Sequence, residues 1–184
     1  MIRQQPVYSW DSSGIPVLLY PALIPRSVLA EEIIVQNTTD ESLLYSAIMS
    51  SSLPDSYSYL LEISLLGTMD KAAGASAGNL TLRLYIDNDL LSQVVLSFPI
   101  GQAVANKGLF LYTLVTVRSV GYSGTCLGAM RLHELMTNSL LLDVPRSVHN
   151  INTTADSICR VTAQFSVAHA NNVLRVQHGF CGRR

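Results

Sequence analysis

The stretch that decides the fold runs from Asn79 to Phe98 and reads NLTLRLYIDNDLLSQVVLSF. In its first half Leu80, Leu82, Leu84 and Ile86 alternate with polar or amphipathic residues, and this period of two places them on one face of a strand. Asp87-Asn88-Asp89 has the composition of a turn. The alternation then resumes with Val94, Leu96 and Phe98. The stretch therefore predicts an antiparallel β-hairpin with one buried face.

The same period continues on both sides of this hairpin. Residues 157–169 place Cys159, Val161, Ala163, Phe165 and Val167 on one face. Further strands are predicted near residues 28–35, 59–65, 108–120 and 173–176, and the β-branched and aromatic content of 108–120 is typical of a strand. Residues 41–50 and 125–137 fit either a strand or a short helix. About eight strands separated by turns predict an all-β, antiparallel, jelly-roll-like sandwich over residues 28–184.

The first 27 residues differ from the rest because they hold four of the seven prolines. Proline fixes φ and disfavours helix at the preceding residue, so residues 1–27 are predicted to form an extended amino-terminal arm. The arm is also apolar, which indicates that it packs on another surface rather than remaining a free terminus. Its expected contact residues are Val7, Tyr8, Trp10, Leu18 and Tyr20.

The composition favours a protein-binding surface. The formal net charge is −1, only 14% of residues are charged and 48% are hydrophobic. No apolar run reaches the roughly 18–20 residues that a membrane-spanning helix needs. No basic cluster with interleaved aromatic residues suggests nucleic-acid binding. Low charge with few lysines is typical of a large protein interface, and the alternative is a monomer with an unusually apolar surface.

Arginine dominates the basic residues, since only Lys71 and Lys107 are lysines among the 12. Five arginines fall inside predicted strands, on the face away from the buried row. Arginine makes planar, hydrogen-bonded contacts and is enriched at interfaces. We therefore predict interface roles for these five, against the alternative of an ordinary solvated sheet face; they are Arg83, Arg118, Arg131, Arg160 and Arg175.

The sequence gives no positive sign of catalysis or of a metal or cofactor site. No serine lies in a G-x-S-x-G elbow, and the four histidines are scattered. His133-Glu134 begins like a zinc-binding H-E-x-x-H motif, but position 137 is threonine. The Asp87–Asp89 turn lacks the other ligands of a calcium loop. The chain is therefore predicted to be a non-enzyme without metal or cofactor.

Three cysteines, Cys126, Cys159 and Cys181, form no C-x-x-C pair. The amino terminus lacks the apolar segment of a secretory signal, so free thiols in a reducing host cytoplasm are expected. A Cys159–Cys181 or a Cys126–Cys159 disulfide remains an open alternative.

Two stretches resemble virion proteins of tailed bacteriophages. Asn152-Thr-Thr-Ala155, followed by Arg160-Val-Thr-Ala-Gln-Phe-Ser166 and by Ala168, Ala170, Asn171 and Asn172, is similar to terminal hairpins of β-sandwich virion proteins. Trp10-Asp-Ser-Ser-Gly-Ile-Pro-Val-Leu18 resembles the amino-terminal arm of such proteins. The resemblance implies a head decoration (cement) protein, typically a homotrimer on the capsid surface that binds the major capsid protein.

The leading hypothesis is therefore a structural virion protein that decorates a bacteriophage capsid by oligomerising and binding the major capsid protein or other virion proteins. Alternatives are a tail or baseplate structural protein, a carbohydrate- or receptor-binding sandwich, a hydrolase on a β scaffold and a shell-forming capsid protein. Aromatic residues make up 7% of the chain and Trp10 is the only tryptophan, which counts against sugar stacking. The sequence does not determine the oligomer number, the strand order or the location in the virion.

Overall fold

The structure is a computed structural model that describes residues 7–10, 16–19, 27–29, 31–49, 59–71, 78–98, 103–135, 139–143 and 148–183. These residues form strands and their connecting turns. Within these ranges no helix has the length and hydropathy that a membrane crossing requires.

Among the described residues, eight strands are eight or more residues long. They are β5 (Ser42–Met49), β6 (Tyr59–Lys71), β7 (Gly78–Ile86), β8 (Asp89–Phe98), β9 (Val104–Ser119), β10 (Gly124–Glu134), β13 (Ser157–Phe165) and β14 (Val173–Arg183). The part of the chain that the structure describes also contains six shorter strands: β1 (Val7–Trp10), β2 (Pro16–Leu19), β3 (Ser27–Val28), β4 (Ile33–Gln36), β11 (Ser139–Asp143) and β12 (His149–Ile151).

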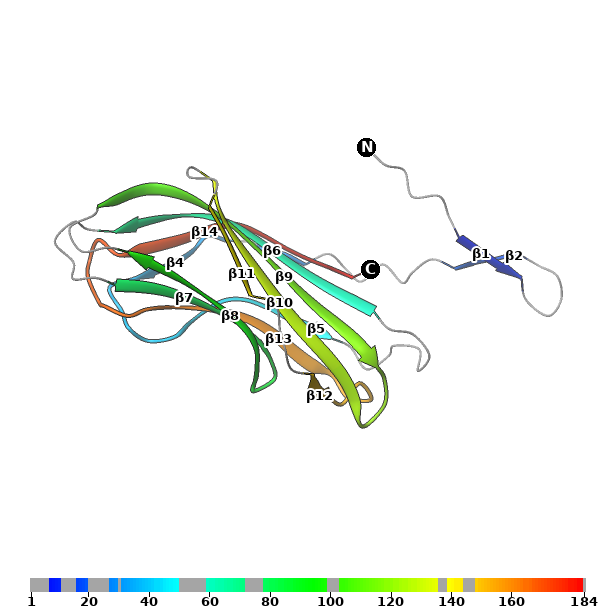
Figure 1. The fold of residues 1–184 in the computed structure, drawn as a ribbon. Coiled ribbons are helices and arrows are strands. Elements are labelled where there is room, and N and C mark those ends of the chain that lie inside the picture. Colours follow the sequence, from blue (N-terminus) through cyan, green and yellow to red (C-terminus); the bar gives the residue numbers. More distant parts are fainter. Residues whose placement is uncertain are drawn as a thin grey trace.

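Two antiparallel sheets face each other (Figure 1). The eight-stranded sheet, called the large sheet below, has the order β11-β10-β9-β6-β14-β3, with β12 beside β10 and β4 beside β14. The four-stranded sheet, called the small sheet, has the order β5-β13-β7-β8. The predicted all-β, jelly-roll-like sandwich is confirmed, although its two layers are unequal in size.

The chain moves between the layers repeatedly. The hairpin β7–β8 belongs to the small sheet, whereas the strands before and after it, β6 and β9, pair with each other in the large sheet. Likewise β13 pairs with β5 and β7, and the next strand, β14, inserts between β6 and β4. Strands distant in sequence are therefore neighbours in both layers.

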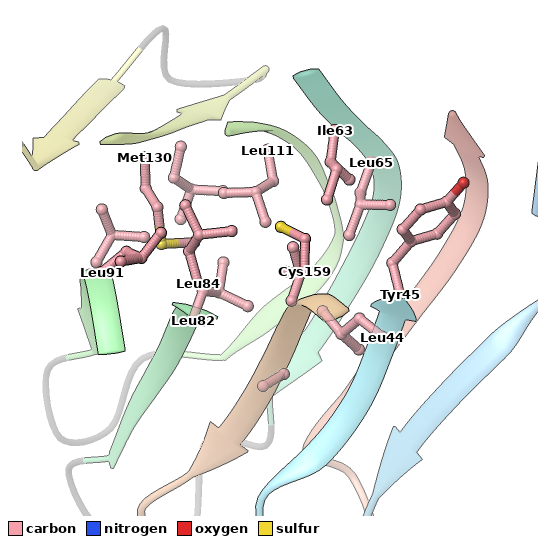
Figure 2. Packing of buried hydrophobic residues seen from close by; sticks show 14 of the residues in the cluster. Leu44, Tyr45, Ile63, Leu65, Leu82, Leu84, Leu91, Leu111, Met130 and Cys159 are labelled. Atoms are coloured by element: carbon pink, nitrogen blue, oxygen red, sulfur yellow. The ribbon is translucent and has the colours of Figure 1, made fainter. Parts of the chain in front are cut away.

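The core lies between the two sheets, where their inner faces meet (Figure 2). Leu84 of β7, Ile63 of β6 and Val161 of β13 are 0% exposed. The face assignments made from the alternation are confirmed for the hairpin at residues 79–98 and for Cys159–Phe165. A fully buried leucine or isoleucine contributes about 1.5–3 kcal/mol through removal of apolar surface from water.

The two ambiguous stretches are both strands, β5 and β10. Each is an amphipathic segment that pairs with a long neighbour, and this pairing overrides moderate helix propensity. The predicted low-complexity loop at residues 71–78 falls largely outside the described residues. The predicted arm contains a hairpin, β1–β2, which Figure 1 shows apart from the two sheets. Ser27 pairs with Cys181, so the large sheet begins one residue before the expected boundary.

Candidate interaction surfaces

The outer face of the large sheet, which points away from the core, is rich in apolar side chains. One cross-strand row runs Leu140–His133–Phe110–Leu66–His178 over five strands, and the next runs Leu142–Arg131–Tyr112–Ser64–Phe180. Leu66, Leu140 and Leu142 are 37%, 45% and 60% exposed, and Ile34 on β4 is 52% exposed. Two adjacent rows of leucine and aromatic side chains make this face unlike an ordinary solvated sheet surface.

Arginines also occur on this outer face, with Arg131 in the second row. Arg131 and Arg118 are exposed, and Arg175 forms an ion pair with Asp70, with an Nη1–Oδ2 distance of 2.6 Å. Glu62 belongs to this face but is only 6% exposed, and it accepts a hydrogen bond of 2.7 Å from the hydroxyl of Tyr112. Apolar and aromatic side chains with arginine and without lysine have the composition of a protein-interface core.

The outer face of the small sheet carries a polar, hydrogen-bonded network on β7 and β13. Arg83 of β7 donates to Gln164 Oε1 of β13 at 2.9 Å and lies 3.5 Å from Glu41 Oε2. Thr162 also donates to Glu41, and Gln164 Nε2 donates to the Thr39 carbonyl at 2.8 Å. These contacts join β7, β13 and the residues that precede β5 into one network.

The network sets the ionisation of Glu41. Burial alone would raise the pKa of this carboxyl, but hydrogen bonds from Thr162 and Tyr85 and the charge of Arg83 outweigh burial, so the pKa lies below the ordinary 4.5. The pKa of Tyr85 is raised, first by burial and then by the neighbouring Glu41 carboxylate. Both groups therefore hold their usual charge states at neutral pH.

A second arginine adds further contacts on the same outer face. The Arg160 guanidinium lies 5.5 Å from the centroid of the Tyr85 ring and donates to the Asp87 carbonyl. Asp87 has a φ of 50°, and its Oδ1 accepts a hydrogen bond from the Ile158 amide at 2.8 Å. The predicted turn at Asp87–Asp89 is thus a hairpin turn attached to β13.

The sequence-predicted interface residues occupy three separate places. Arg83 and Arg160 lie on the outer face of the small sheet, whereas Arg118, Arg131 and Arg175 lie on the outer face of the large sheet. In the arm, Tyr8 pairs with Leu18, Val7 pairs with Leu19 and Trp10 pairs with Pro16. Tyr20 lies outside the described residues. The structure therefore does not gather the ten into one patch, and their interface role stays a prediction.

The four histidines do not converge. His133 and His178 share one row of the large sheet but are separated by β9 and β6, while His149 lies on β12. His169 accepts from the Asn171 amide through Nδ1 at 3.1 Å. Glu134, next to His133, points to the opposite face and forms an ion pair with Lys107 at 2.5 Å. The described ranges contain no group of three or more metal-ligating side chains.

The three cysteines are buried free thiols. Cys126 and Cys181 belong to the large sheet, with β9 and β6 between their strands, and Cys159 faces that sheet from the small sheet. Packed sheets lie about 10 Å apart, whereas the Cα atoms of a disulfide are about 4.4–6.8 Å apart. Burial raises the pKa of Cys126 and of Cys181 to about 11, and it raises the pKa of Cys159 further. Neither candidate disulfide forms in this structure.

A small cavity between the sheets is wholly apolar. Its volume is about 20 Å³, enough for roughly one water molecule, and leucines from both sheets line it, among them Leu44, Leu82 and Leu111. This cavity is too small for an organic ligand.

The sequence analysis did not identify two groups of surface residues. The polar network comprises Glu41, Tyr85, Thr162 and Gln164, and the exposed leucines of the large sheet are Leu66, Leu140 and Leu142. Alternation does assign Tyr85 and Gln164 to outward positions. The register that brings β7 beside β13, and β11 beside β10, is a long-range property that alternation does not contain. One signal was available, because residues 108–120 are apolar on both faces, which is typical of a strand covered on both sides.

Comparisons with known proteins give only distant structural likenesses. No family model matches the chain, and no curated protein matches it in sequence. The CBM2 module of the evolved Dit of Lactobacillus casei BL23 phage J-1 is 10% identical, covers 98% of this chain and 80% of its own, and has a TM-score of 0.40. Lectin I of Ulex europaeus, solved with the methyl glycoside of α-L-fucose, is 6% identical, covers 97% and 90%, and has a TM-score of 0.36. Lectin II of Ulex europaeus is 10% identical, covers 98% and 91%, and has a TM-score of 0.29. At these TM-scores no residue role and no function is transferred to this chain.

Proposed function

We propose that this protein is a non-enzymatic structural component of a tailed-bacteriophage virion that binds another virion protein through the outer face of its large sheet. The observation that carries the proposal is a pair of adjacent rows on that face in which leucine, phenylalanine and tyrosine predominate, with histidine, arginine and serine at the other positions. Large apolar patches rimmed by polar residues are typical of protein-binding sites. The resemblance of the arm and of residues 152–172 to phage virion proteins supplies the virion context.

The chemistry of this face defines the partner. Arg131 is exposed within the second row, so the partner surface should be apolar with an acidic group opposite this arginine. Burying Leu140 and Leu142 against such a surface removes apolar area from water, which provides the association free energy. On a virion many identical contacts act together, so a weak single contact suffices.

The test is cosedimentation of the purified chain with DNA-free capsids and, separately, with tails of the phage that carries its gene. Binding to capsids would support the decoration (cement) hypothesis, and binding only to tails would support the tail or baseplate alternative. Leu142→Asp should weaken the binding at least tenfold, because the charge would be desolvated at the interface. Val95→Asp, a comparably apolar position on the small sheet, is the matched control. Failure to bind either particle would overturn the proposal.

A second candidate function is carbohydrate binding on the outer face of the small sheet. The observation that favours it is the network of Arg83, Glu41 and Gln164, which fixes hydrogen-bond donors and acceptors on an open surface next to Tyr85. Sugar hydroxyls require such paired groups in fixed positions. A glycan array probed with the wild-type chain and with Arg83→Ala tests it. Hits that disappear in the variant support carbohydrate binding, and an array without hits rejects it.

A further inference from the structure

The two edges of the small sheet differ in whether they contact the rest of the protein. At one edge, β8 is attached to β11 of the large sheet, because Asp143 Oδ2 accepts from Ser92 Oγ at 2.7 Å and from the Gln93 amide at 2.9 Å. At the other edge, β5 pairs with β13 on one side, and no described strand pairs with its other side. An edge strand presents unpaired backbone N–H and C=O groups that can pair with another strand.

The side chains of β5 do not protect this edge. Soluble proteins usually protect an edge strand with lysine, proline or an inward-pointing charge. The strand reads SLLYSAIM and contains none of these side chains; a β-bulge, which can also protect an edge, is the one such device in β5. Instead Leu43 and Ile48 are 51% and 66% exposed on the outer face, and Ile158, the cross-strand neighbour of Ile48, is 46% exposed. An apolar edge of this length is typical of a strand that pairs with another chain.

A β-bulge makes the row of outward-pointing side chains on β5 symmetric about its central residue. Val161 pairs with Tyr45 and Thr162 pairs with Leu43, so Leu44 is the extra residue, and both Leu44 and Tyr45 point inward. The outward row is therefore Leu43, Ser46 and Ile48, with Ser46 at its centre. Suppose that β5 of a second copy lies antiparallel beside it and that each strand keeps its bulge. Ser46 of one copy then faces Ser46 of the other, and Leu43 of each copy faces Ile48 of the other. Every outward residue then meets an outward residue.

We propose that β5 is a homodimerisation edge, which pairs with β5 of a second copy around a two-fold axis through Ser46. The two small sheets then form one continuous antiparallel sheet across the dimer. The pairing satisfies the open backbone groups and covers Leu43 and Ile48 of both copies. This surface is separate from the outer face of the large sheet, so the dimer goes beyond the proposed function and does not depend on it.

Light scattering of the full chain at tens of micromolar is the first test. The expected mass is twice the 20.0 kDa of one chain. Ile48→Lys and Ser46→Lys should give monomers, because both positions are exposed and a charge at the axis would face its own copy. Leu142→Lys, on the large sheet, should leave the dimer intact. A monomeric wild-type chain, a trimer, or variants at β5 that keep the wild-type mass would overturn the proposal.

Cross-linking tests the register. Directly opposed residues of antiparallel strands have Cα atoms about 4.5–5.5 Å apart, within the reach of a disulfide. Ser46→Cys should therefore form a covalent dimer under mild oxidation, whereas Leu43→Cys alone should not, and the double variant Leu43→Cys/Ile48→Cys should. The natural cysteines are at most 3% exposed and give little background. A dimer in which Ser46→Cys fails to cross-link, or in which Leu43→Cys alone does, would overturn the two-fold pairing.

Discussion

Glu41 shows how individual residues connect the strands of the small sheet. It precedes β5, and its carboxylate is held by Thr162 of β13 and by Arg83 and Tyr85 of β7. Because its pKa is depressed in the folded state, the network stabilises the fold above pH 4.5, and this stabilisation is lost as the pH falls through the folded pKa. Arg83 and Glu41 are partly exposed, so solvent screening keeps the contribution modest.

Replacing Thr162 by valine should raise the pKa of Glu41, because the hydrogen bond that opposes the effect of burial is removed while the shape of the side chain is kept. A carboxyl-carbon NMR titration of the wild type and the variant measures this shift. Thr81→Val, on the same outer face, is the control and should leave the Glu41 titration unchanged. An unchanged midpoint in Thr162→Val would show that the hydroxyl does not hold the carboxylate.

The three buried thiols should be inert in the native protein. With the pKa values of Cys126 and Cys181 near 11, almost no thiolate exists at pH 8, and burial also blocks access. Iodoacetamide should therefore modify none of the three in native buffer and all three in guanidinium chloride, as counted by mass spectrometry. Rapid native labelling of one site would show that the core opens locally.

At the scale of elements, one glycine controls how closely the two sheets approach. A Cβ atom on Gly128 of β10 would lie 2.4 Å from the Leu91 Cβ of β8, so the strands could not keep their separation. Gly128→Ala should destabilise the fold by about 1–3 kcal/mol, as overpacking of a well-packed core does. Urea denaturation measures the change, and Ala129→Val, whose side chain is not fully buried, is the control with a small expected effect.

Removing the hydrogen bonds that attach β8 to β11 should affect the structure only locally. Asp143→Ala removes the acceptor for the Gln93 amide and the Ser92 hydroxyl, so the Gln93 amide should exchange with solvent faster. Hydrogen exchange followed by NMR measures this rate. The amide of Leu82, in the middle of β7, serves as the internal reference and should keep its protection. Equal acceleration of both amides would indicate global destabilisation instead.

The sequence predicted the individual strands better than it predicted which strands pair with each other. The hairpin at residues 79–98 and the inward row of β13 follow from alternation, since burial on one face imposes a period of two. The sequence left β5 and β10 undecided, because their strand character comes from pairing with β13 and β9. The candidate surfaces were predicted least well, because each is assembled from residues that only the register brings together, such as Arg83 beside Gln164.

At the scale of the whole molecule, the amino-terminal arm should be separable from the sandwich. The strands β1 and β2 pair only with each other among the described strands, whereas β3 pairs with β14. Deleting residues 1–26 should therefore leave the thermal unfolding temperature nearly unchanged by circular dichroism while reducing binding to the virion partner. The full-length chain is the reference for both measurements. Undiminished binding by the truncated chain would remove the arm from the interface.

The position of β14 between β6 and β4 has a consequence for synthesis in the cell. Leu61 must pair with Arg183, so β6 leaves the ribosome long before its neighbour exists. Likewise β5 cannot pair until its neighbour β13 has been synthesised. Such long-range pairing makes folding slow, since distant segments must meet before they stabilise each other. The nascent chain would therefore expose β5 and β6 until β13 and β14 have been synthesised, and the two sheets should form only then, with help from a chaperone that covers apolar strands.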